Sequence, residues 1–227
     1  MRLSSVAAYV DAVEGALVPL RDARRAVAMA AYMKDRFSFL GIPAPARRAA
    51  IKPIPRPAPA KVHPIVRALW KRREREYQYV ALDLFDSMAR ELDTSKSLAL
   101  VEELTLKKSW WDCVDGLAGI GSKILRHNAN ARGVVRNWSS HQSFWVNRLA
   151  ILHQNGWGDA TDQKVLFKIC LAHAHKEEFF VRKAIGWALR EYAWNNPTAV
   201  RDFVERNANI LSKLSAREAM KNIGEQA

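Results

Sequence analysis

The segment KKSWWDCVD, from Lys107 to Asp115, combines residue types that could act on a cation. Trp111 and Asp115 are four residues apart, so both side chains project from one face of a helix. The positive end of that helix favours an ionised Asp115. An aromatic wall beside a carboxylate suits a cationic, electron-poor ligand. The structural alternative is that Trp111 belongs to the core and that Asp115 forms a buried ion pair with Arg148.

The helix that carries these residues is expected to begin at Trp110. Ser109 has the side chain of an N-cap residue, and Asp112 follows three residues later, as in a capping box. The stretch GLAGIGSK, from Gly116 to Lys123, resembles a phosphate-binding loop only superficially, because it follows a helix and lacks the GK[ST] order. We interpret it as the end of the helix and a turn.

Similar segments recur along the chain. YQYVALDLFD begins at Tyr77, WDCVDGLAGI at Trp111, WVNRLAILHQ at Trp145 and FVRKAIGWAL at Phe180, at successive offsets of 34, 34 and 35 residues. Each segment opens with an aromatic residue, and a second helix fits between successive copies. Helix pairs at this period form a solenoid, in which each pair buries its apolar face on its neighbours. The alternative is a coincidence among ordinary amphipathic helices.

Two positions of this repeat carry charges where other copies are apolar. The fifth position is a carboxylate, Asp115, in the second copy and is apolar in the other three. The fourth position is valine in the first two copies and cationic in the last two, as Arg148 and Lys183. Charges at core-like positions are costly unless they are paired or functional. Asp115 and Arg148 are therefore the first candidates for a functional site.

The remaining sequence also favours helices, because apolar residues recur at spacings of three and four and no alternating β pattern of useful length occurs. We predict an all-α fold, a right-handed superhelical α-solenoid of HEAT-like repeats with a concave basic face. Residues 1–227 are expected to form a single domain. A proline-rich, extended connection is expected at about residues 53–64.

The net charge predicts a polyanionic partner. The chain has 36 Lys and Arg against 23 Asp and Glu, a formal net charge of +13, and 49% hydrophobic residues allow it to fold. Two acid-free stretches, 36–73 and 116–158, hold ten and five of the basic residues. A local surplus of this kind attracts phosphate and releases counterions from nucleic acid.

Several other classes of protein are not indicated. No apolar run approaches the roughly 18 residues of a membrane span. Cys113 and Cys170 form neither a zinc pattern nor a disulfide framework, which fits a cytoplasmic protein. His173 and His175 are interpreted as surface histidines, since this spacing points the two rings apart on a helix. We expect no metal and no cofactor, and nothing indicates an oligomer, so a monomer is expected.

Five segments together resemble the AlkD family of bacterial DNA alkylation-repair glycosylases. They are KKSWWDCVD, SFWVNRLAIL, EEFFVRKAIGWALREYAWNNP, YMKDRFSFLGIPAPARR and LWKRREREYQYVALDLF, and the similarity runs from about Val27 to the C-terminus. That family is built of HEAT-like repeats and hydrolyses the N-glycosidic bond of cationic N3- and N7-alkylated purines. The resemblance implies a monofunctional glycosylase whose partner is double-stranded DNA containing alkylated bases.

The resemblance also implies roles for individual residues. Asp115 would be catalytic, together with Trp111 and Trp187. Arg148 and Tyr32 would contact the DNA backbone near the lesion. Other cations in the matching segments are expected to bind DNA as well: Lys107, Lys108, Arg182, Lys183 and Arg190.

Two further functions fit parts of this pattern. A non-catalytic HEAT-repeat protein that binds distorted or branched DNA would share the charge and the repeats, although phosphate binding does not require Asp115, Trp111 and Trp187. A protein-interaction scaffold would instead have a concave face of mixed charge.

Overall fold

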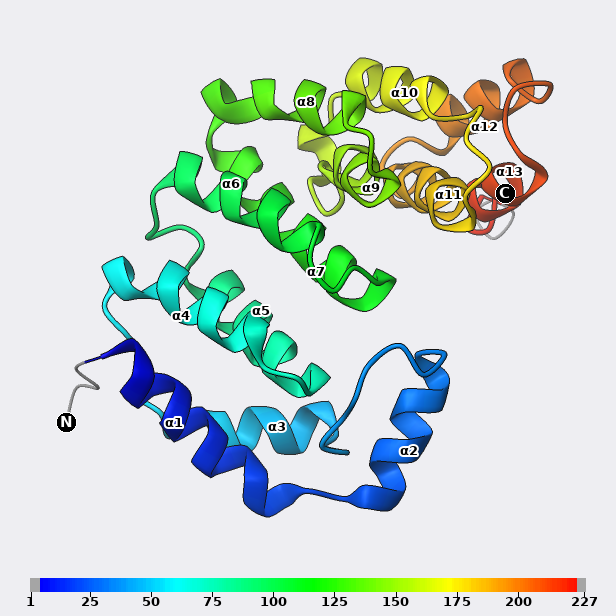
Figure 1. Ribbon diagram of the computed structural model, residues 1–227. Helices are drawn as coiled ribbons and strands as arrows, with labels where there is room; N and C mark the ends of the chain where they lie inside the picture. The colour runs from blue at the N-terminus through cyan, green and yellow to red at the C-terminus, as the bar shows by residue number, and fades with distance from the viewer. Residues whose placement is uncertain (1–4, 224–227) are drawn as a thin grey trace. The chain divides into compact units, whose positions relative to one another are not determined.

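The computed structural model describes residues 5–223, and all regular secondary structure in this part of the chain is helical (Figure 1). The chain divides into two compact units, with the boundary between Asp93 and Thr94. The predicted all-α fold is therefore confirmed, whereas the single-domain organisation and the concave basic face stay predictions.

The first unit contains α1 (Val6–Leu17), α2 (Ala23–Tyr32), α3 (Ala44–Ile51), α4 (Pro59–Lys71) and α5 (Arg75–Met88). The second contains α6 (Thr94–Thr105), α7 (Trp111–His127), α8 (Val134–Ser140), α9 (Phe144–Leu152), α10 (Gln163–Ala172), α11 (Phe179–Ala193), α12 (Pro197–Arg206) and α13 (Lys213–Ala219). Short 3-10 helices occupy Val18–Leu20, Ala129–Gly133 and Gly158–Ala160.

The proline-rich connection is shorter than the sequence suggests. It lies inside the first unit, where α3 ends at Ile51 and α4 already begins at Pro59. Proline suits the first position of a helix, because the amide that it lacks would have no helical partner there. Pro64 also lies within α4 rather than in the connection. The expectation of an extended segment as far as residue 64 was therefore wrong for its second half.

A buried carboxylate fixes the turn that follows α2. Glu76, at the start of α5, accepts hydrogen bonds from the backbone N–H groups of Leu40, Gly41 and Ile42 at 2.9, 2.9 and 3.1 Å. Gly41 has φ +86°, and a Cβ there would lie 2.1 Å from the carbonyl oxygen of Asp22. The close approach requires glycine, and the three N–H donors satisfy a charge that would otherwise be costly to bury.

The second unit is built around α9. Its residues from Val146 to Leu152 are all buried, so the helix is enclosed on every side. It packs against α7, α8, α10 and α11. Because α9 carries Arg148, this arrangement places a cation inside the unit and makes a nearby anion necessary.

The predicted repeat is visible in the helices. The four aligned segments fall in α5, α7, α9 and α11, and α6, α8 and α10 lie between them along the chain. The helices pack as the pairs α4 with α5, α6 with α7 and α8 with α9 (Figure 1). The pairing is thus confirmed for these described helices, and within the second unit α7, α9 and α11 pack successively on one another.

Buried amides join the two helices of a pair. The side chain of Gln78 in α5 donates to three carbonyl groups at the end of α4, those of Leu69, Trp70 and Arg72. In the same way, Asn147 in α9 donates to three carbonyls at the end of α8. The last carbonyls of a helix have no partner within it, so each amide completes the preceding helix.

Helix α7 differs from its prediction at both ends. Its N-cap is Trp110, without a side-chain hydrogen bond, while the Ser109 hydroxyl donates to the carbonyl of Thr105 at 2.6 Å. The helix then continues through the glycine-rich stretch to His127, so the interpretation of Gly116–Lys123 as a helix end and a turn was wrong. Burial of Leu117, Ile120, Ile124 and Leu125 outweighs the helix-breaking tendency of glycine, which is about 1 kcal/mol per residue.

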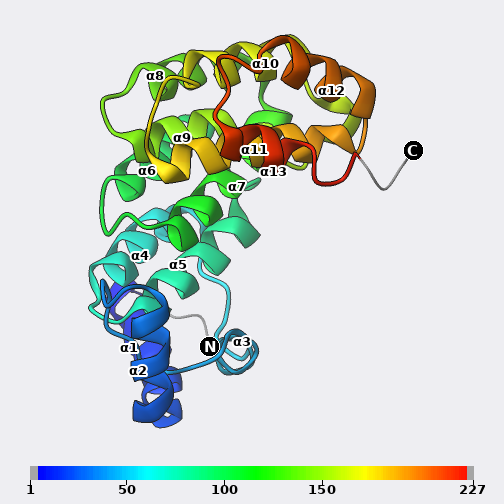
Figure 2. The same cartoon turned by 90° about the vertical axis from the view of Figure 1, so that its right-hand side faces the viewer.

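Helix α13 lies alongside α11 (Figure 2). The contact is closest at Gly186, where a Cβ would lie 2.4 Å from the Cβ of Glu218 and 2.8 Å from the carbonyl oxygen of Ser215. Ser215 also donates its hydroxyl to the carbonyl of Arg182 at 2.9 Å. The absence of a side chain at Gly186 therefore lets α13 reach the backbone of α11.

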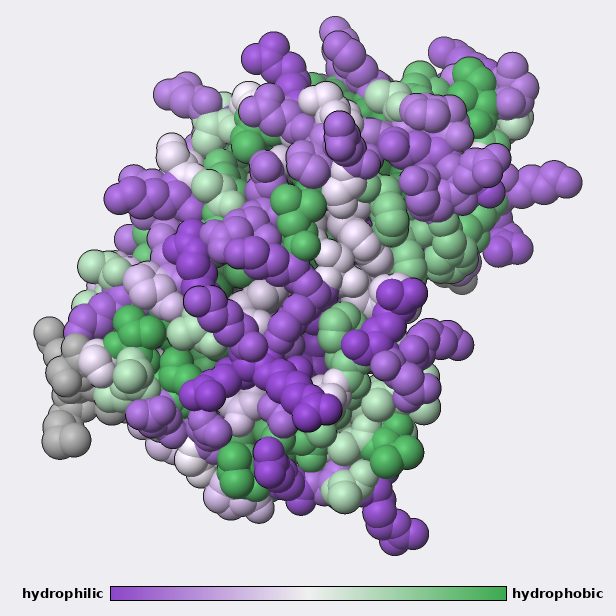
Figure 3. All heavy atoms as spheres, in the orientation of Figure 1, coloured by the Kyte–Doolittle hydropathy of each residue, from purple (hydrophilic) through white to green (hydrophobic). Residues whose placement is uncertain are grey.

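The face drawn in Figure 3 is covered mostly by hydrophilic side chains, with smaller apolar areas among them. Among the described residues, no helix has the length and apolar character needed to cross a membrane.

Candidate functional site

Asp115 and Arg148 form a bidentate ion pair in the second unit. Arg148 donates from Nε to Oδ1 of Asp115 at 2.7 Å and from Nη2 to Oδ2 at 2.9 Å. The carboxylate comes from α7 and the guanidinium from α9, so the pair links two neighbouring repeats. Planar two-point contacts of this kind fix the orientation of both groups.

The two partners differ in exposure. The side chain of Arg148 is 3% exposed, whereas that of Asp115 is 22% exposed. The third nitrogen of Arg148, Nη1, donates to the carbonyl oxygen of Phe180 at the start of α11. The guanidinium of α9 is thus held by groups from two other helices, α7 and α11, while the carboxylate that it orients retains an accessible surface.

This geometry alters the expected role of Arg148. Each of its three nitrogens donates a hydrogen bond within the protein, and the side chain is buried. Two of its five N–H groups remain for a phosphate, and burial of the side chain restricts access to them. The structure instead supports the alternative in which Arg148 pairs with Asp115, although the partial exposure of Asp115 distinguishes the pair from a fully buried one.

Trp187 lies beside the ion pair. The guanidinium carbon of Arg148 is 5.9 Å from the centroid of the Trp187 ring. Trp111 is the first residue of α7, one turn before Asp115, and is half-buried. The structure thus brings Asp115, Arg148 and Trp187 together, with Trp111 on the same helix as Asp115.

An aromatic cluster adjoins this site, and the sequence indicated it only in part. Phe180 packs against Trp145 and Trp110, with ring centroids 5.0 and 5.2 Å apart. Trp145 and Phe180 open their repeat segments, and Trp110, the N-cap residue just before the aligned Trp111, packs with both. The recurring aromatic residue in each repeat was the signal in the sequence.

Lys183 and Arg190 surround a second carboxylate, which the sequence did not indicate. Glu218 of α13 is 3% exposed and contacts Lys183 at 2.8 Å, Arg190 at 2.7 Å and Lys221 at 2.7 Å. Burial opposes its ionisation, but hydrogen bonds from these three cations outweigh that effect and lower the pKa of Glu218 to about 2. Two residues expected to bind DNA thus also hold α13 on α11.

Acidification should therefore weaken the second unit. Above pH 4.5, the ordinary pKa, Glu218 is charged in both the folded and the unfolded state, and its ion pairs stabilise the folded state. As the pH falls from 4.5 towards 2, the unfolded state takes up a proton before the folded state does, so this stabilisation is lost. The partly exposed cations limit the loss to on the order of 1–2 kcal/mol. Urea unfolding should show that the free energy of unfolding decreases less between pH 7 and pH 3 for Glu218→Gln than for wild type. Glu205→Gln, at an exposed position of α12, should behave as wild type.

The remaining predicted residues lie at the surface or near helix ends. Tyr32 is the last residue of α2 in the first unit and is 70% exposed. Lys107 pairs with Glu103 at 2.8 Å and is exposed, whereas Lys108 has a left-handed backbone with φ +55°. Arg182 donates from Nε to the carbonyl of Lys176 at 3.1 Å.

The two histidines of the HxH motif differ from their prediction. His175 is exposed, but His173 is 2% exposed and its Nε2 lies 2.9 Å from the hydroxyl of Ser139. The interpretation of His173 as a surface residue was therefore wrong, because α8 covers it. Within residues 5–223 no group of three His, Cys, Asp or Glu side chains could hold a metal ion.

A solved structure and a family model match this chain over nearly its whole length. No curated protein matches it. A solved structure described as a predicted DNA alkylation repair enzyme from Enterococcus faecalis is 32% identical, with a TM-score of 0.81, and the match covers 88% of this chain and 95% of that one. Residues 13–223 match the model of a family of DNA alkylation repair enzymes. Since the match includes the ion pair and both units, the chain belongs to the DNA alkylation repair enzyme family.

Proposed function

We propose that this protein is an AlkD-like DNA glycosylase. It would hydrolyse the N-glycosidic bond of cationic N3- and N7-alkylated purines, such as 3-methyladenine and 7-methylguanine, in duplex DNA. The observation that carries the proposal is the carboxylate of Asp115, which is oriented by the buried Arg148 and remains 22% exposed. Arg148 in turn lies beside the ring of Trp187. Membership of a DNA alkylation repair family supplies the class of substrate.

The chemistry requires little proton transfer to the base. An N3- or N7-alkylated purine is already positively charged, so it can leave without protonation. Departure creates positive charge on the deoxyribose, and a fixed carboxylate stabilises that charge in the transition state. The same carboxylate can orient and deprotonate the attacking water. Asp115 has the charge and the accessible surface for both roles.

Arg148 would act through Asp115. Its two hydrogen bonds fix the plane of the carboxylate before the substrate binds, which reduces the reorganisation needed in the transition state. Trp111 and Trp187 would provide aromatic faces to the cationic sugar and the adjoining backbone. Arg148 is therefore proposed as a positioning residue, with Asp115 and the two tryptophans in contact with the substrate.

Exposed and half-buried cations would bind the DNA backbone. Lys107 is exposed, Lys108 and Arg182 are half-buried, and Lys183 and Arg190 are partly exposed while paired with Glu218. Tyr32 would contact the backbone from the first unit. Contacts of this kind fix the position of the protein on the duplex without reading its sequence.

A non-catalytic DNA-binding protein is the second candidate. The ion pair between Asp115 and Arg148 also links α7, α9 and, through Phe180, α11, so it would be useful for stability alone. Such a protein would bind alkylated duplex without releasing a base. The two functions therefore differ in whether free alkylated base is produced.

Base release distinguishes the candidates. Duplex DNA containing 7-methylguanine is incubated with the protein, and free base is measured by chromatography. We expect release of 7-methylguanine without strand cleavage, because hydrolysis by water leaves an intact abasic strand. Binding to the same duplex without any released base would contradict the glycosylase and favour the non-catalytic protein.

A further inference from the structure

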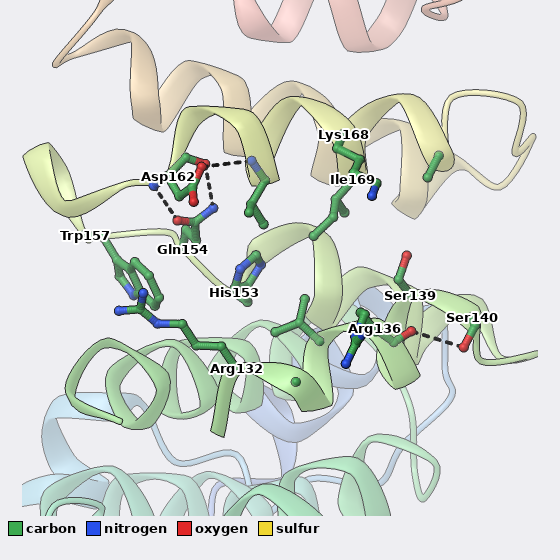
Figure 4. A pocket seen from close by; sticks show the side chains of 14 residues that line it. Arg132, Arg136, Ser139, Ser140, His153, Gln154, Trp157, Asp162, Lys168 and Ile169 are labelled. Carbon is green, nitrogen blue, oxygen red and sulfur yellow. Dashed lines mark hydrogen bonds between the residues drawn. The ribbon is translucent and has the colours of Figure 1, made fainter. Parts of the chain in front are cut away.

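A cavity of about 700 Å³ lies between α8 and α10, above the end of α9 (Figure 4). Val135 of α8 and Val165 and Ile169 of α10 form apolar walls. The volume is within the range of small-molecule sites in proteins, roughly 300–1,000 Å³. Asp115 and Arg148 do not line it, so the cavity is separate from the site described above.

Hydrogen bonds connect the elements on both sides of the cavity. At one end, Ser139 of α8 and His173 at the end of α10 are joined by the 2.9 Å hydrogen bond described above. At the other, Gln154 donates to the carbonyl of Asp162 at 3.2 Å and accepts from its backbone N–H at 2.7 Å (Figure 4). The first bond connects α8 to the end of α10, and the other two connect the segment after α9 to the start of α10.

His153 places a hydrogen-bond acceptor inside the cavity. The residue is 4% exposed, and its Nδ1 must donate to the carbonyl of Ala150, 2.7 Å away. Burial lowers the pKa of His153 to about 4, so the ring is neutral near pH 7 and its Nε2 carries a lone pair. Within residues 5–223 this nitrogen has no hydrogen-bond partner. Because this nitrogen keeps contact with solvent in the cavity, a ligand that donates a hydrogen bond can replace water there.

The rim of the cavity is positively charged. Arg132, Arg136 and Lys168 line it, against the single carboxylate of Asp162. Arg132 is partly engaged, since it lies over the ring of Trp157 at 4.8 Å. Arg136 and Lys168 are exposed and form no ion pair in the described part of the chain. An anionic group at the rim would therefore meet two unpaired cations.

We propose that this cavity binds a small amphipathic anion. The ligand would have an apolar body of one or two rings between α8 and α10. It would have an N–H or O–H group that donates to Nε2 of His153. It would also have one acidic group, a carboxylate, sulfonate or phosphate, at Arg136 and Lys168. This site is independent of the proposed glycosylase activity.

A dye with these three features tests the proposal. 8-Anilino-1-naphthalenesulfonate has a naphthalene body, an aromatic N–H and a sulfonate group. Fluorescence titration of the full-length protein should show saturable binding at one site per chain. His153→Phe should weaken binding by about tenfold through loss of one buried hydrogen bond. Lys168→Glu should weaken it by about the same factor, since it removes one cation and adds a repulsive charge.

Matched controls separate this site from general dye binding. Lys164→Glu changes the same charge on an exposed position of α10 that does not line the cavity, and it should leave the affinity unchanged. N-Phenyl-1-naphthylamine lacks the sulfonate, so its affinity should be insensitive to Lys168→Glu. Thermal unfolding checks that each variant is folded. Because Lys168 is exposed, that variant remains informative even if His153→Phe does not fold.

Two outcomes would overturn the proposal. The first is fluorescence that increases without saturation, or with several sites per chain. The second is an affinity for the sulfonate dye that is the same in wild type, Lys168→Glu and Lys164→Glu. In either case the cavity would not recognise an anion.

Discussion

Replacing Asp115 by asparagine is expected to lower the rate of 7-methylguanine release by about 100- to 1,000-fold. Asparagine has the same size, but it carries no negative charge to stabilise a cationic sugar and cannot deprotonate water. The measurement is release of base from a lesion-containing duplex in a single turnover, with protein in excess over DNA. A rate equal to that of wild type would show that Asp115 is not the catalytic carboxylate.

Loss of folding must be separated from loss of chemistry. Asp115→Asn leaves the buried Arg148 without its ionic partner, and removal of one partner from a buried pair destabilises a protein. The unfolding temperature and the affinity for duplex DNA should therefore be measured on the same preparation. Asp112→Asn is a matched control, because it removes a carboxylate from the same helix and leaves the pair with Arg148 intact. That variant should release base at the wild-type rate.

Two glycine-to-alanine substitutions are expected to change stability in opposite directions. At Gly186 the new methyl group would lie 2.4 Å from the Cβ of Glu218, and 2.8 Å from a backbone oxygen of α13. Helix α13 would have to move, at a cost of about 1–3 kcal/mol. At Gly119, inside α7, nothing lies within 4 Å of the new methyl group. Alanine there should stabilise the protein by about 0.4–1 kcal/mol, because it restricts the unfolded chain.

Thermal unfolding of the two variants tests this contrast. For a chain of this length, 1 kcal/mol corresponds to a change of about 2–4 °C in the unfolding temperature. Gly186→Ala should unfold earlier than wild type, and Gly119→Ala should unfold later. If both variants unfolded at the same temperature, the close approach of α13 to α11 would not be a tight contact.

The sequence predicted the repeat because its signal is local. An aromatic residue, an apolar helix and a second helix recur about every 34 residues, and burial of those apolar faces determines how the helices pair. The end of α7 could not be predicted in this way, since glycines normally favour a terminus. Contacts made by Leu117 and Ile120 with other helices keep the segment helical. Such contacts depend on residues distant in the sequence.

The candidate site was predictable in composition but not in geometry. Misplaced charges in the repeat pointed to Asp115 and Arg148, and their pairing was one of the alternatives. The alignment could not show that Arg148 is enclosed while Asp115 stays partly exposed, because exposure depends on where Phe180 and Trp187 pack. Nor could it show that Glu218 lies beside Lys183, since this contact requires the close approach at Gly186.

The buried amides of Gln78 and Asn147 bear on how such a chain can be lengthened or cut. Each amide completes the end of the preceding helix, so α4 and α8 depend on a residue beyond the following turn. If the chain were cut between the two helices of a pair, the three carbonyl groups at the end of the first helix would lose their bonds to the amide. A break placed between pairs would leave these bonds intact. The transferable module of this architecture is therefore a helical hairpin, and recombination or gene duplication would succeed at hairpin boundaries.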